Sequence, residues 1–233
     1  MNLFMKVAIL QFPGSNCDWD AEHAVKDVLG INAARIWHKS SLPSETEAII
    51  VPGGFSFGDY LRCGAIARFS PIMKDVKSFA EKGGQILGIC NGFQILCEAG
   101  LLPGALIRND CLEFRCVNQK VKVIDSNDRF NPSKLGSELV IPIAHGEGNY
   151  RLESAELDKL ESNKQVLLRY NDNPNGSIND IAGIRNEQGN VYGMMPHPER
   201  AVESYHPSTD GISILKSFLE PVLNPSSAEL SAS

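Results

Sequence analysis

Short apolar runs alternate with amphipathic stretches over the first hundred residues of the chain. Four runs have the length of buried strands, and they span residues 6–12, 35–38, 48–51 and 85–89. Three stretches carry apolar residues at three- and four-residue spacing, which predicts helices over residues 18–29, 71–82 and 91–99. Ser70 is placed to cap the second of these helices. Strands that alternate with helices predict an α/β domain with a largely parallel sheet.

The second half of the chain differs, because its apolar runs follow one another with fewer helices between them. Candidate strands span residues 114–124, 139–143, 166–170, 181–185 and 191–195. The last two flank a short polar turn, which predicts an antiparallel hairpin, and a closing helix is expected over residues 211–219. The pattern therefore predicts a mostly parallel central sheet flanked by helices, with an additional antiparallel strand region in the second half.

No linker or internal repeat divides the chain, so the sequence predicts one domain over residues 1–223. Residues 224–233 form a polar tail that is expected to be disordered. A content of 42% hydrophobic and 21% charged residues is ordinary for a globular protein. The net charge is −6 and no basic cluster is present, which argues against a nucleic-acid partner. Without a run of about 18 apolar residues, no membrane helix is expected.

The cysteines and the N-terminus bear on the compartment. Six cysteines stand at positions 17, 63, 90, 97, 111 and 116. No pair has C-x-x-C spacing, so no metal site is predicted. The first residues predict a strand rather than a charged leader with an apolar core, so we expect a cytoplasmic protein with free thiols.

One cysteine lies in a motif associated with nucleophilic catalysis. Gly88-Ile89-Cys90-Asn91-Gly92 joins a predicted strand to a predicted helix, in the pattern of a nucleophile elbow with cysteine in place of serine. Such a turn lifts Cys90 out of the sheet, and the helix N-terminus behind it favours the thiolate. The Asn91 backbone N–H then points to where an oxyanion would form. A buried cysteine at a tight turn is the alternative interpretation.

A nucleophilic cysteine needs a general base, and two of the five histidines are candidates. His197 and Glu199 lie two positions apart in an extended Met-Pro-His-Pro-Glu segment, so both face one side and the carboxylate can orient the imidazole. His145 and Glu147 have the same spacing within a glycine-rich segment. A proline-rich surface loop and a glycine-rich surface turn are the respective alternatives.

The second donor of an oxyanion hole has to come from another loop. Val51-Pro52-Gly53-Gly54 leaves a predicted strand and has two glycines where the backbone could approach a ligand. The Gly54 N–H is therefore a candidate donor toward the Cys90 site. An ordinary Pro-Gly turn is the alternative.

These residues carry a resemblance to a known family. Pro52-Gly53-Gly54, the elbow and His197-Pro198-Glu199 follow the order and rough spacing of the triad (class I) glutamine amidotransferases. Three further stretches resemble the glutaminase subunits of phosphoribosylformylglycinamidine synthase, and they span residues 11–18, 53–67 and 144–148. The resemblance covers about residues 5–220 and implies a flavodoxin-like amidotransferase domain.

The resemblance implies the roles of the site residues. It places the catalytic triad at Cys90, His197 and Glu199, and thereby favours His197 over His145 as the base. It places the oxyanion donors at Gly54 and Asn91. The remaining candidates for the glutamine pocket are Gly53, Phe55, Gln94, His145, Gly146 and Glu147.

The resemblance also implies a reaction and partners. Glutamine would be hydrolysed to glutamate and ammonia through a Cys90 thioester. The ammonia would pass to a separate synthetase subunit, which converts formylglycinamide ribonucleotide to formylglycinamidine ribonucleotide in purine biosynthesis. The family also has a small accessory subunit. The chain has no phosphate-loop pattern, so ATP and Mg are expected on the synthetase, with no cofactor or metal on this chain.

Other functions stay open from the residues alone. A cysteine peptidase or amidase on a similar fold also uses an elbow cysteine, and an inactive homologue would only bind or scaffold. Cys17 is either a second reactive thiol or a loop residue near the pocket. Residues 58–62 shape the pocket mouth or a partner surface, or have only a structural role.

Overall fold

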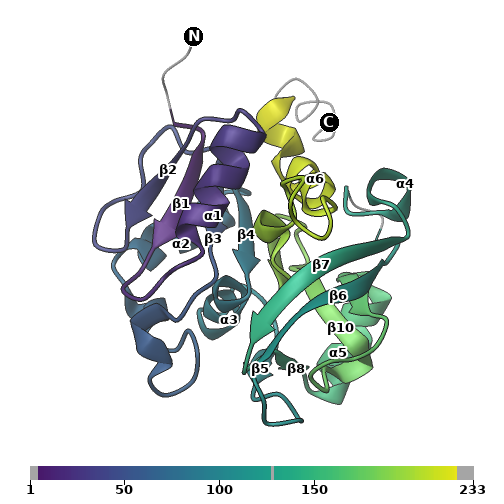
Figure 1. Ribbon diagram of the computed structural model, residues 1–233. Helices are drawn as coiled ribbons and strands as arrows, with labels where there is room; N and C mark the ends of the chain where they lie inside the picture. The colour runs from purple at the N-terminus through teal and green to yellow at the C-terminus, as the bar shows by residue number, and fades with distance from the viewer. Residues whose placement is uncertain (1–4, 127–128, 225–233) are drawn as a thin grey trace.

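A computed structural model describes residues 5–126 and 129–224 (Figure 1). The disordered tail expected from the sequence lies outside the described residues, apart from Asn224. A nine-stranded sheet runs through both halves of the chain, in the order β2-β1-β3-β4-β11-β10-β9-β6-β7. Among the described residues no helix is long and apolar enough to cross a membrane.

Five strands at one side of the sheet run parallel to one another. They are β2 (Ala33–Trp37), β1 (Val7–Gln11), β3 (Ala48–Val51), β4 (Gln85–Ile89) and β11 (Val191–Met194). All residues of β3 and β11 are buried, and so are four of the five in β4. Their Val- and Ile-rich sequences suit strands that are covered on both faces. The carboxyl ends of these parallel strands therefore meet at one edge of the sheet.

The other strands of the sheet pair antiparallel. They are β10 (Ile181–Arg185), β9 (Val166–Tyr170), β6 (Arg115–Val123) and β7 (Glu138–His145). A small separate sheet pairs β5 (Ala105–Ile107) with β8 (Asn149–Arg151). Edge strand β7 is protected from further pairing, because Asp210 and His197 bond to its outer backbone groups at Val140 and Pro142.

Six α-helices and several shorter helical turns connect the strands of the described chain. The helices are α1 (Asp18–His23), α2 (Ile72–Glu81), α3 (Asn91–Glu98), α4 (Pro132–Leu135), α5 (Ser154–Ser162) and α6 (Gly211–Leu223). A π-helical segment, Ala24–Val28, continues α1, and 3-10 turns cover Ser56–Asp59, Ala67–Phe69, Ile178–Asp180 and Pro198–Arg200. Helix α1 packs against β1 and β2, and α3 packs against β3, β4 and β11.

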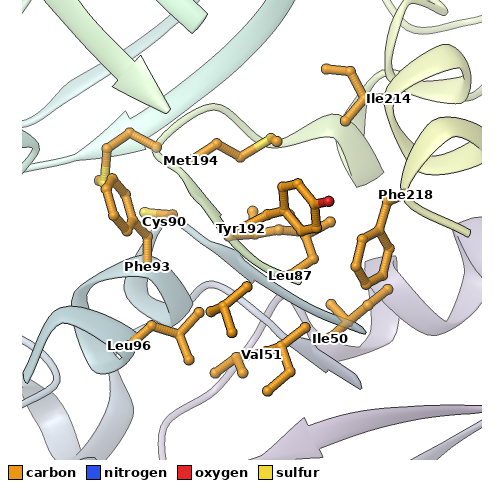
Figure 2. Packing of buried hydrophobic residues seen from close by; sticks show 14 of the residues in the cluster. Ile50, Val51, Leu87, Cys90, Phe93, Leu96, Tyr192, Met194, Ile214 and Phe218 are labelled. Atoms are coloured by element: carbon orange, nitrogen blue, oxygen red, sulfur yellow. The ribbon is translucent and has the colours of Figure 1, made fainter. Parts of the chain in front are cut away.

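The centre of the core lies where α3 and α6 pack against the middle strands. Figure 2 shows side chains of β3, β4 and β11 between Leu96 of α3 and Phe218 of α6. Cys90 lies at one end of this packed region, next to Phe93 and Met194. The core therefore holds rigidly the strand that carries the candidate nucleophile.

The predicted fold class is confirmed. The structure has the α/β arrangement, the parallel strands in the first half and the antiparallel region in the second, including the β10–β11 hairpin. The sequence missed β5, β8, α4 and α5. Strands β5 and β8 have only three residues each. In α5 only Leu157 and Leu160 are buried, so the helical period is weak.

One expected helix cap is wrong. The Ser70 hydroxyl bonds to His38 Nδ1 at 3.1 Å, and no side-chain hydrogen bond caps α2. His38 is buried at the end of β2 and takes the hydroxyl as its partner. Local sequence cannot show this competition, because the two residues are 32 positions apart.

Candidate active site

The register of the central sheet brings three loops together at its carboxyl edge. Strand β4 lies between β3 and β11, with Val51 opposite Gly88 and Met194 opposite Ile89. The next residue, Cys90, bonds through its N–H to the Met194 carbonyl at 2.8 Å. Consequently the segments that begin at residues 52, 90 and 195 leave the sheet side by side. In open α/β sheets this edge is the usual ligand-binding position.

Cys90 occupies a strained turn between β4 and α3. Its φ is +50° and its ψ is −105°, which non-glycine residues rarely adopt. An added Cβ at Gly92 would lie 1.8 Å from the Val51 carbonyl oxygen, so only glycine permits α3 to start this close to β3. The Cys90 thiol is buried and lies 3.6 Å from the Ala144 carbonyl. This is the geometry of a nucleophile elbow, with the positive end of α3 at the sulfur.

His197 and Glu199 form a buried pair beside Cys90. The segment after β11 is held by the His197 N–H, which donates to the Pro142 carbonyl of β7 at 2.8 Å. The imidazole Nδ1 bonds to Glu199 Oε1 at 2.6 Å, and both side chains are almost fully buried. Since Nδ1 bonds to Glu199, Nε2 is the ring nitrogen left for proton exchange, and no group of the described residues bonds to it. Cys90 is close enough to His197 to affect its charge state.

The charge state of His197 follows from its neighbours. Burial disfavours the imidazolium, but the negative charges of Glu199 and of a Cys90 thiolate outweigh it. The pKa of His197 is therefore raised well above its usual value. An imidazolium beside a thiolate is the activated state of a cysteine nucleophile, and Glu199 fixes the ring orientation in that state.

Two backbone N–H groups are available near the nucleophile. Asn91 is the first residue of α3, so its N–H has no acceptor inside the helix. Gly54 has a φ of +131° and packs on Ser15 and Asn16 of the loop after β1, where an added Cβ would lie 2.8 Å from the Asn16 nitrogen. In the described part of the chain no group accepts a hydrogen bond from the Gly54 N–H. The assignment of Gly54 and Asn91 as oxyanion donors stays a prediction.

His145 is adjacent to the site but is bonded on both ring nitrogens. Its Nδ1–H donates to Asn109 Oδ1 at 3.1 Å, and Asn175 Nδ2 lies 3.5 Å from its Nε2. The Asn109 amide is oriented by its own donor bonds to the carbonyls of Glu113 and His145. His145 is therefore a neutral imidazole with its proton on Nδ1. It has no free nitrogen with which to act as the base for Cys90.

Burial and the positive charge of His197 lower the pKa of His145 to about 4. Its i+2 neighbour Glu147 does not pair with it; the Glu147 carboxylate accepts from the Cys63 N–H at 3.3 Å. The structure thus brings Cys90, His197 and Glu199 together as the candidate triad, whereas His145 and Glu147 lie beside them and bond to other groups.

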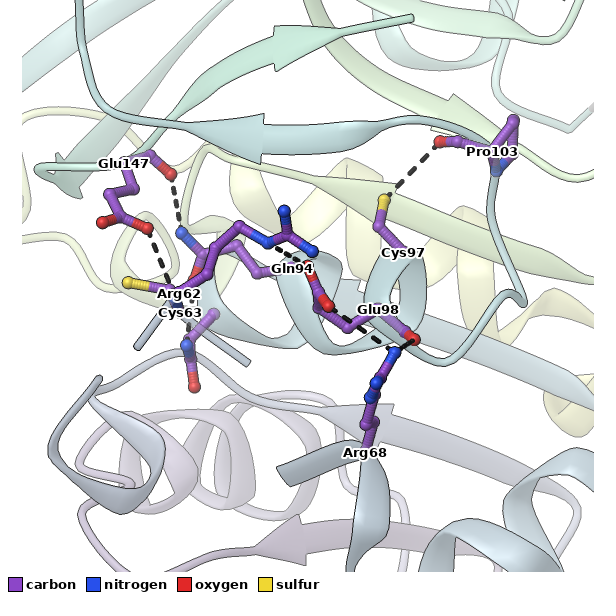
Figure 3. Close-up of polar contacts among 9 residues, drawn as sticks. Arg62, Cys63, Arg68, Gln94, Cys97, Glu98, Pro103 and Glu147 are labelled. Carbon is purple, nitrogen blue, oxygen red and sulfur yellow. Dashed lines mark hydrogen bonds and ion pairs between the residues drawn. The ribbon is translucent and has the colours of Figure 1, made fainter. Parts of the chain in front are cut away.

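A hydrogen-bonded chain joins the candidate pocket residues to the elbow. Asn91 Oδ1 accepts from the Ser56 N–H at 3.2 Å, and Asn91 Nδ2 donates to Gln94 Oε1 at 2.9 Å. Gln94 Nε2 then donates to the Glu147 carbonyl at 2.6 Å, as Figure 3 shows. The loop after β3, helix α3 and the loop after β7 are therefore fixed to one another around Cys90.

Two further predicted pocket residues, Phe55 and Gly146, contact segments around residues 109–114. Phe55 is half-exposed and its ring stacks on Phe114, with centroids 6.3 Å apart. The Gly146 carbonyl accepts from the Asn109 N–H at 2.9 Å. Sequence reasoning missed Asn109, Asn175 and Phe114. Asn109 and Asn175 lie in irregular segments and Phe114 begins a predicted strand, and only the fold shows that they contact residues 145–148.

Metal binding is not favoured by the groups around the triad. Among the described residues, one set of three potential ligands lies close together, Cys17, His197 and Glu199, with ligand atoms within 4.8 Å. Arg200 Nη2 donates a hydrogen bond to Cys17 Sγ at 3.1 Å, however, so a positively charged guanidinium already lies at this sulfur. A second cation there would be repelled. The expectation of no metal on this chain stays a prediction.

The fold and the arrangement of Cys90, His197 and Glu199 suit an amidotransferase, and comparison with known proteins shows that family. The chain belongs to the family described as the CobB/CobQ-like glutamine amidotransferase domain, which matches residues 5–212. Within that class it is 56% identical over 219 residues to phosphoribosylformylglycinamidine synthase subunit PurQ of Synechococcus elongatus. That alignment covers 94% of this chain and 99% of the relative. The predicted family resemblance is confirmed.

Solved structures support the same assignment. The structure of PurLQS from Thermotoga maritima matches with a TM-score of 0.85 and 42% identity, covering 94% of this chain and 99% of that chain. A glutamine amidotransferase from Thermotoga maritima matches with a TM-score of 0.58 and 14% identity, covering 97% of this chain and 85% of that chain. The second likeness concerns the fold alone.

Gly53→Ala is expected to displace the His197 ring and lower kcat by about 100-fold, since small misplacements of catalytic groups have effects of that order. An added Cβ would lie 2.7 Å from His197 Cε1 and 3.1 Å from Cys17 Sγ. The measurement is glutamate release by the assembled complex. Gly183→Ala is the matched control, because it adds the same methyl group in β10, 3.1 Å from the Gly193 carbonyl. Equal kcat in both variants would contradict the steric argument.

Proposed function

We propose that this chain is the glutaminase subunit of phosphoribosylformylglycinamidine synthase, acting in the cytoplasm. It hydrolyses glutamine to glutamate and ammonia. The observation that carries this proposal is the Cys90–His197–Glu199 arrangement at the end of the parallel sheet, in a chain 56% identical to a PurQ subunit. The intact pair of His197 and Glu199 speaks against an inactive homologue.

The geometry supports a sequence of steps. The Cys90 thiolate attacks the side-chain amide carbon of glutamine, and the N–H groups of Gly54 and Asn91 stabilise the oxyanion. His197 Nε2 protonates the leaving ammonia as the C–N bond breaks, which leaves a γ-glutamyl thioester on Cys90. His197 then takes a proton from water, which attacks the thioester and releases glutamate. Glu199 holds the ring in one tautomer throughout.

The acceptor reaction belongs to a partner. We assign ATP and Mg to a separate synthetase subunit, which uses the ammonia to convert formylglycinamide ribonucleotide to formylglycinamidine ribonucleotide. The chain carries no phosphate-loop sequence, and its strand ends are used by the glutamine site. A small accessory subunit completes the complex. Free ammonia is mostly protonated near neutral pH, so the two sites should be joined by a protected path.

A strained loop beside the elbow offers a route for coupling to that partner. Tyr60 and Leu61 are strongly exposed, although both side chains are largely apolar. They follow Phe57 and Asp59, which have φ values of +56° and +52°. The same loop is tied to the elbow, because Asn91 Nδ2 lies 3.4 Å from Asp59 Oδ1. A synthetase that covers the exposed side chains would therefore also act on the geometry around Cys90.

The isolated chain is expected to release glutamate slowly, and the rate should rise when the synthetase is bound with its nucleotide and substrate. Glutamine hydrolysis without an acceptor wastes glutamine, so we expect an active site that reaches its full rate only when the synthetase is bound. Glutamate release from the purified chain is measured with and without the other subunits. Full activity that no partner changes would refute the coupling, and ATP-dependent amidine synthesis by this chain alone would refute the division of labour. Hydrolysis of peptides but not of glutamine would instead indicate a peptidase.

A further inference from the structure

A second cysteine lies next to the candidate catalytic histidine. Cys17 precedes α1 in the loop after β1, and only 2% of its surface is exposed. Its sulfur, a His197 ring nitrogen and a Glu199 oxygen lie within 4.8 Å of one another. Gly53 packs against the same two side chains, since an added Cβ would lie 2.7 Å from His197 Cε1 and 3.1 Å from Cys17 Sγ. The imidazole is therefore enclosed between two loops.

The hydrogen bonds of Cys17 are compatible with a neutral thiol. Burial raises the pKa of Cys17 despite its interaction with His197, so the sulfur keeps its proton near neutral pH. Asn16 Oδ1, 3.2 Å away, is the acceptor for that proton. Arg200 Nη2 donates to the sulfur at 3.1 Å, and the sulfur also lies close to the His197 ring. The thiol therefore donates one hydrogen bond and accepts another, which restrains its position.

Arg200 connects this sulfur to a second element of the fold. Its Nε donates to Asp20 Oδ2 of α1 at 2.9 Å, while Nη2 of the same planar guanidinium reaches Cys17. Arg200 follows Glu199 directly, so one arginine holds the segment that carries the triad against the start of α1. A lysine cannot make both bonds, because it has a single point-like donor group.

We propose that Cys17, held by Arg200, is a positioning residue that fixes the His197 imidazole for the glutaminase reaction; this inference rests on the proposed function. Cys17 takes no part in bond making. It packs against the imidazole together with Gly53, and its interaction with the ring favours the protonated form. The role of Glu199 in orienting the imidazole is thereby shared with a thiol from a different loop.

Two other roles for Cys17 fit the structure less well. A second nucleophile would need an accessible thiolate, whereas this thiol is buried and protonated. A metal ligand would need a free sulfur lone pair and a site without positive charge, whereas Arg200 donates to the sulfur. Positioning remains the role that uses all of its contacts.

The test is the kinetics of glutamate release by the assembled complex carrying Cys17→Ala or Cys17→Ser. We expect Cys17→Ala to lower kcat by about 10-fold or more, with KM for glutamine changed less than threefold, because the loosened group is His197 rather than the substrate pocket. Cys17→Ser keeps a small hydroxyl donor and acceptor and should restore most of the lost kcat. Cys97→Ala is the matched control, since Cys97 is also buried but bonds to the Pro103 carbonyl.

The pH profile separates positioning from loss of packing. The charged or titratable groups that face His197 are Glu199, Cys90, Cys17 and His145, and Arg200 faces Glu199. Cys17 favours the protonated ring, so its removal should lower the pKa of His197. The pH above which kcat/KM declines should therefore move down in Cys17→Ala and stay in place in Cys97→Ala. If Cys17 had only a structural role, the alkaline decline of kcat/KM would begin at the same pH in Cys17→Ala as in wild type.

The outcomes are distinguishable. If the wild-type complex released no glutamate, the proposed function itself would fail. If wild type is active but Cys17→Ala matches it in kcat and in pH profile, the positioning role is refuted. Arg200→Lys provides a second variant, which leaves the thiol in place. It should give a smaller loss of kcat and a smaller downward shift of the alkaline decline than Cys17→Ala, and wild-type behaviour would exclude the guanidinium from the arrangement.

Discussion

Replacing Cys90 with alanine is expected to abolish glutamine-dependent formation of formylglycinamidine ribonucleotide, with a loss of at least about 10⁴-fold. Alanine has no nucleophile, and in the described part of the chain the thiol that lies close to His197 is Cys17. This thiol is buried, and burial raises its pKa, so it keeps its proton. Activity with ammonia supplied in place of glutamine should survive in the same assembled complex, because the synthetase then bypasses this site.

The comparison of the two nitrogen sources is the control within the experiment. A variant that had misfolded would fail to co-elute with the synthetase, and co-elution is checked before the rates are compared. A glutamine-mimicking alkylator should label wild type at Cys90 and leave Cys90→Ala unlabelled. Cys116→Ala, which removes an exposed thiol, should label normally. Persistence of glutamine-dependent turnover in Cys90→Ala would remove Cys90 from the mechanism.

The elbow could be predicted because its signal is local. A strand, a turn with two glycines and a helix follow one another within residues 85–98, and the observed elements begin and end where the apolar pattern changes. The steric reason for Gly92 was not visible, because the carbonyl that it approaches belongs to Val51, 41 positions earlier in the printed sequence. A local pattern thus identified the motif, whereas the register of β3 against β4 explains it.

The partners of the two histidines could not be predicted in the same way. His145 and Glu147 have the same spacing as His197 and Glu199, so periodicity alone left them equivalent, and only the family resemblance separated them. The difference comes from long-range packing. Asn109 and Asn175, 36 and 30 positions away, take both nitrogens of His145, while His197 keeps Nε2 free. Amides in irregular segments give no periodic signal that would reveal such contacts.

His197→Ala is expected to be nearly as damaging as loss of Cys90, because it removes both the group that stabilises the thiolate and the proton donor to ammonia. Glu199→Gln should retain measurable activity, because the orienting member of a triad often contributes less than the base. Its loss of activity should be about 10- to 100-fold smaller than that of His197→Ala. His145→Ala should mainly raise KM for glutamine. Steady-state kinetics of glutamate release by the assembled complex give these values.

The pH dependence of Glu199→Gln has a defined sign. Burial lowers the pKa of His197, and the carboxylate of Glu199 is the largest of the effects that raise it. Removing that charge should therefore lower the His197 pKa, so the imidazolium is lost at lower pH. The alkaline decline of kcat/KM should begin at lower pH in Glu199→Gln than in wild type. If His145→Ala abolished thioester formation while His197→Ala retained it, the base would be His145, and the bonds that occupy both of its nitrogens would have to open during turnover.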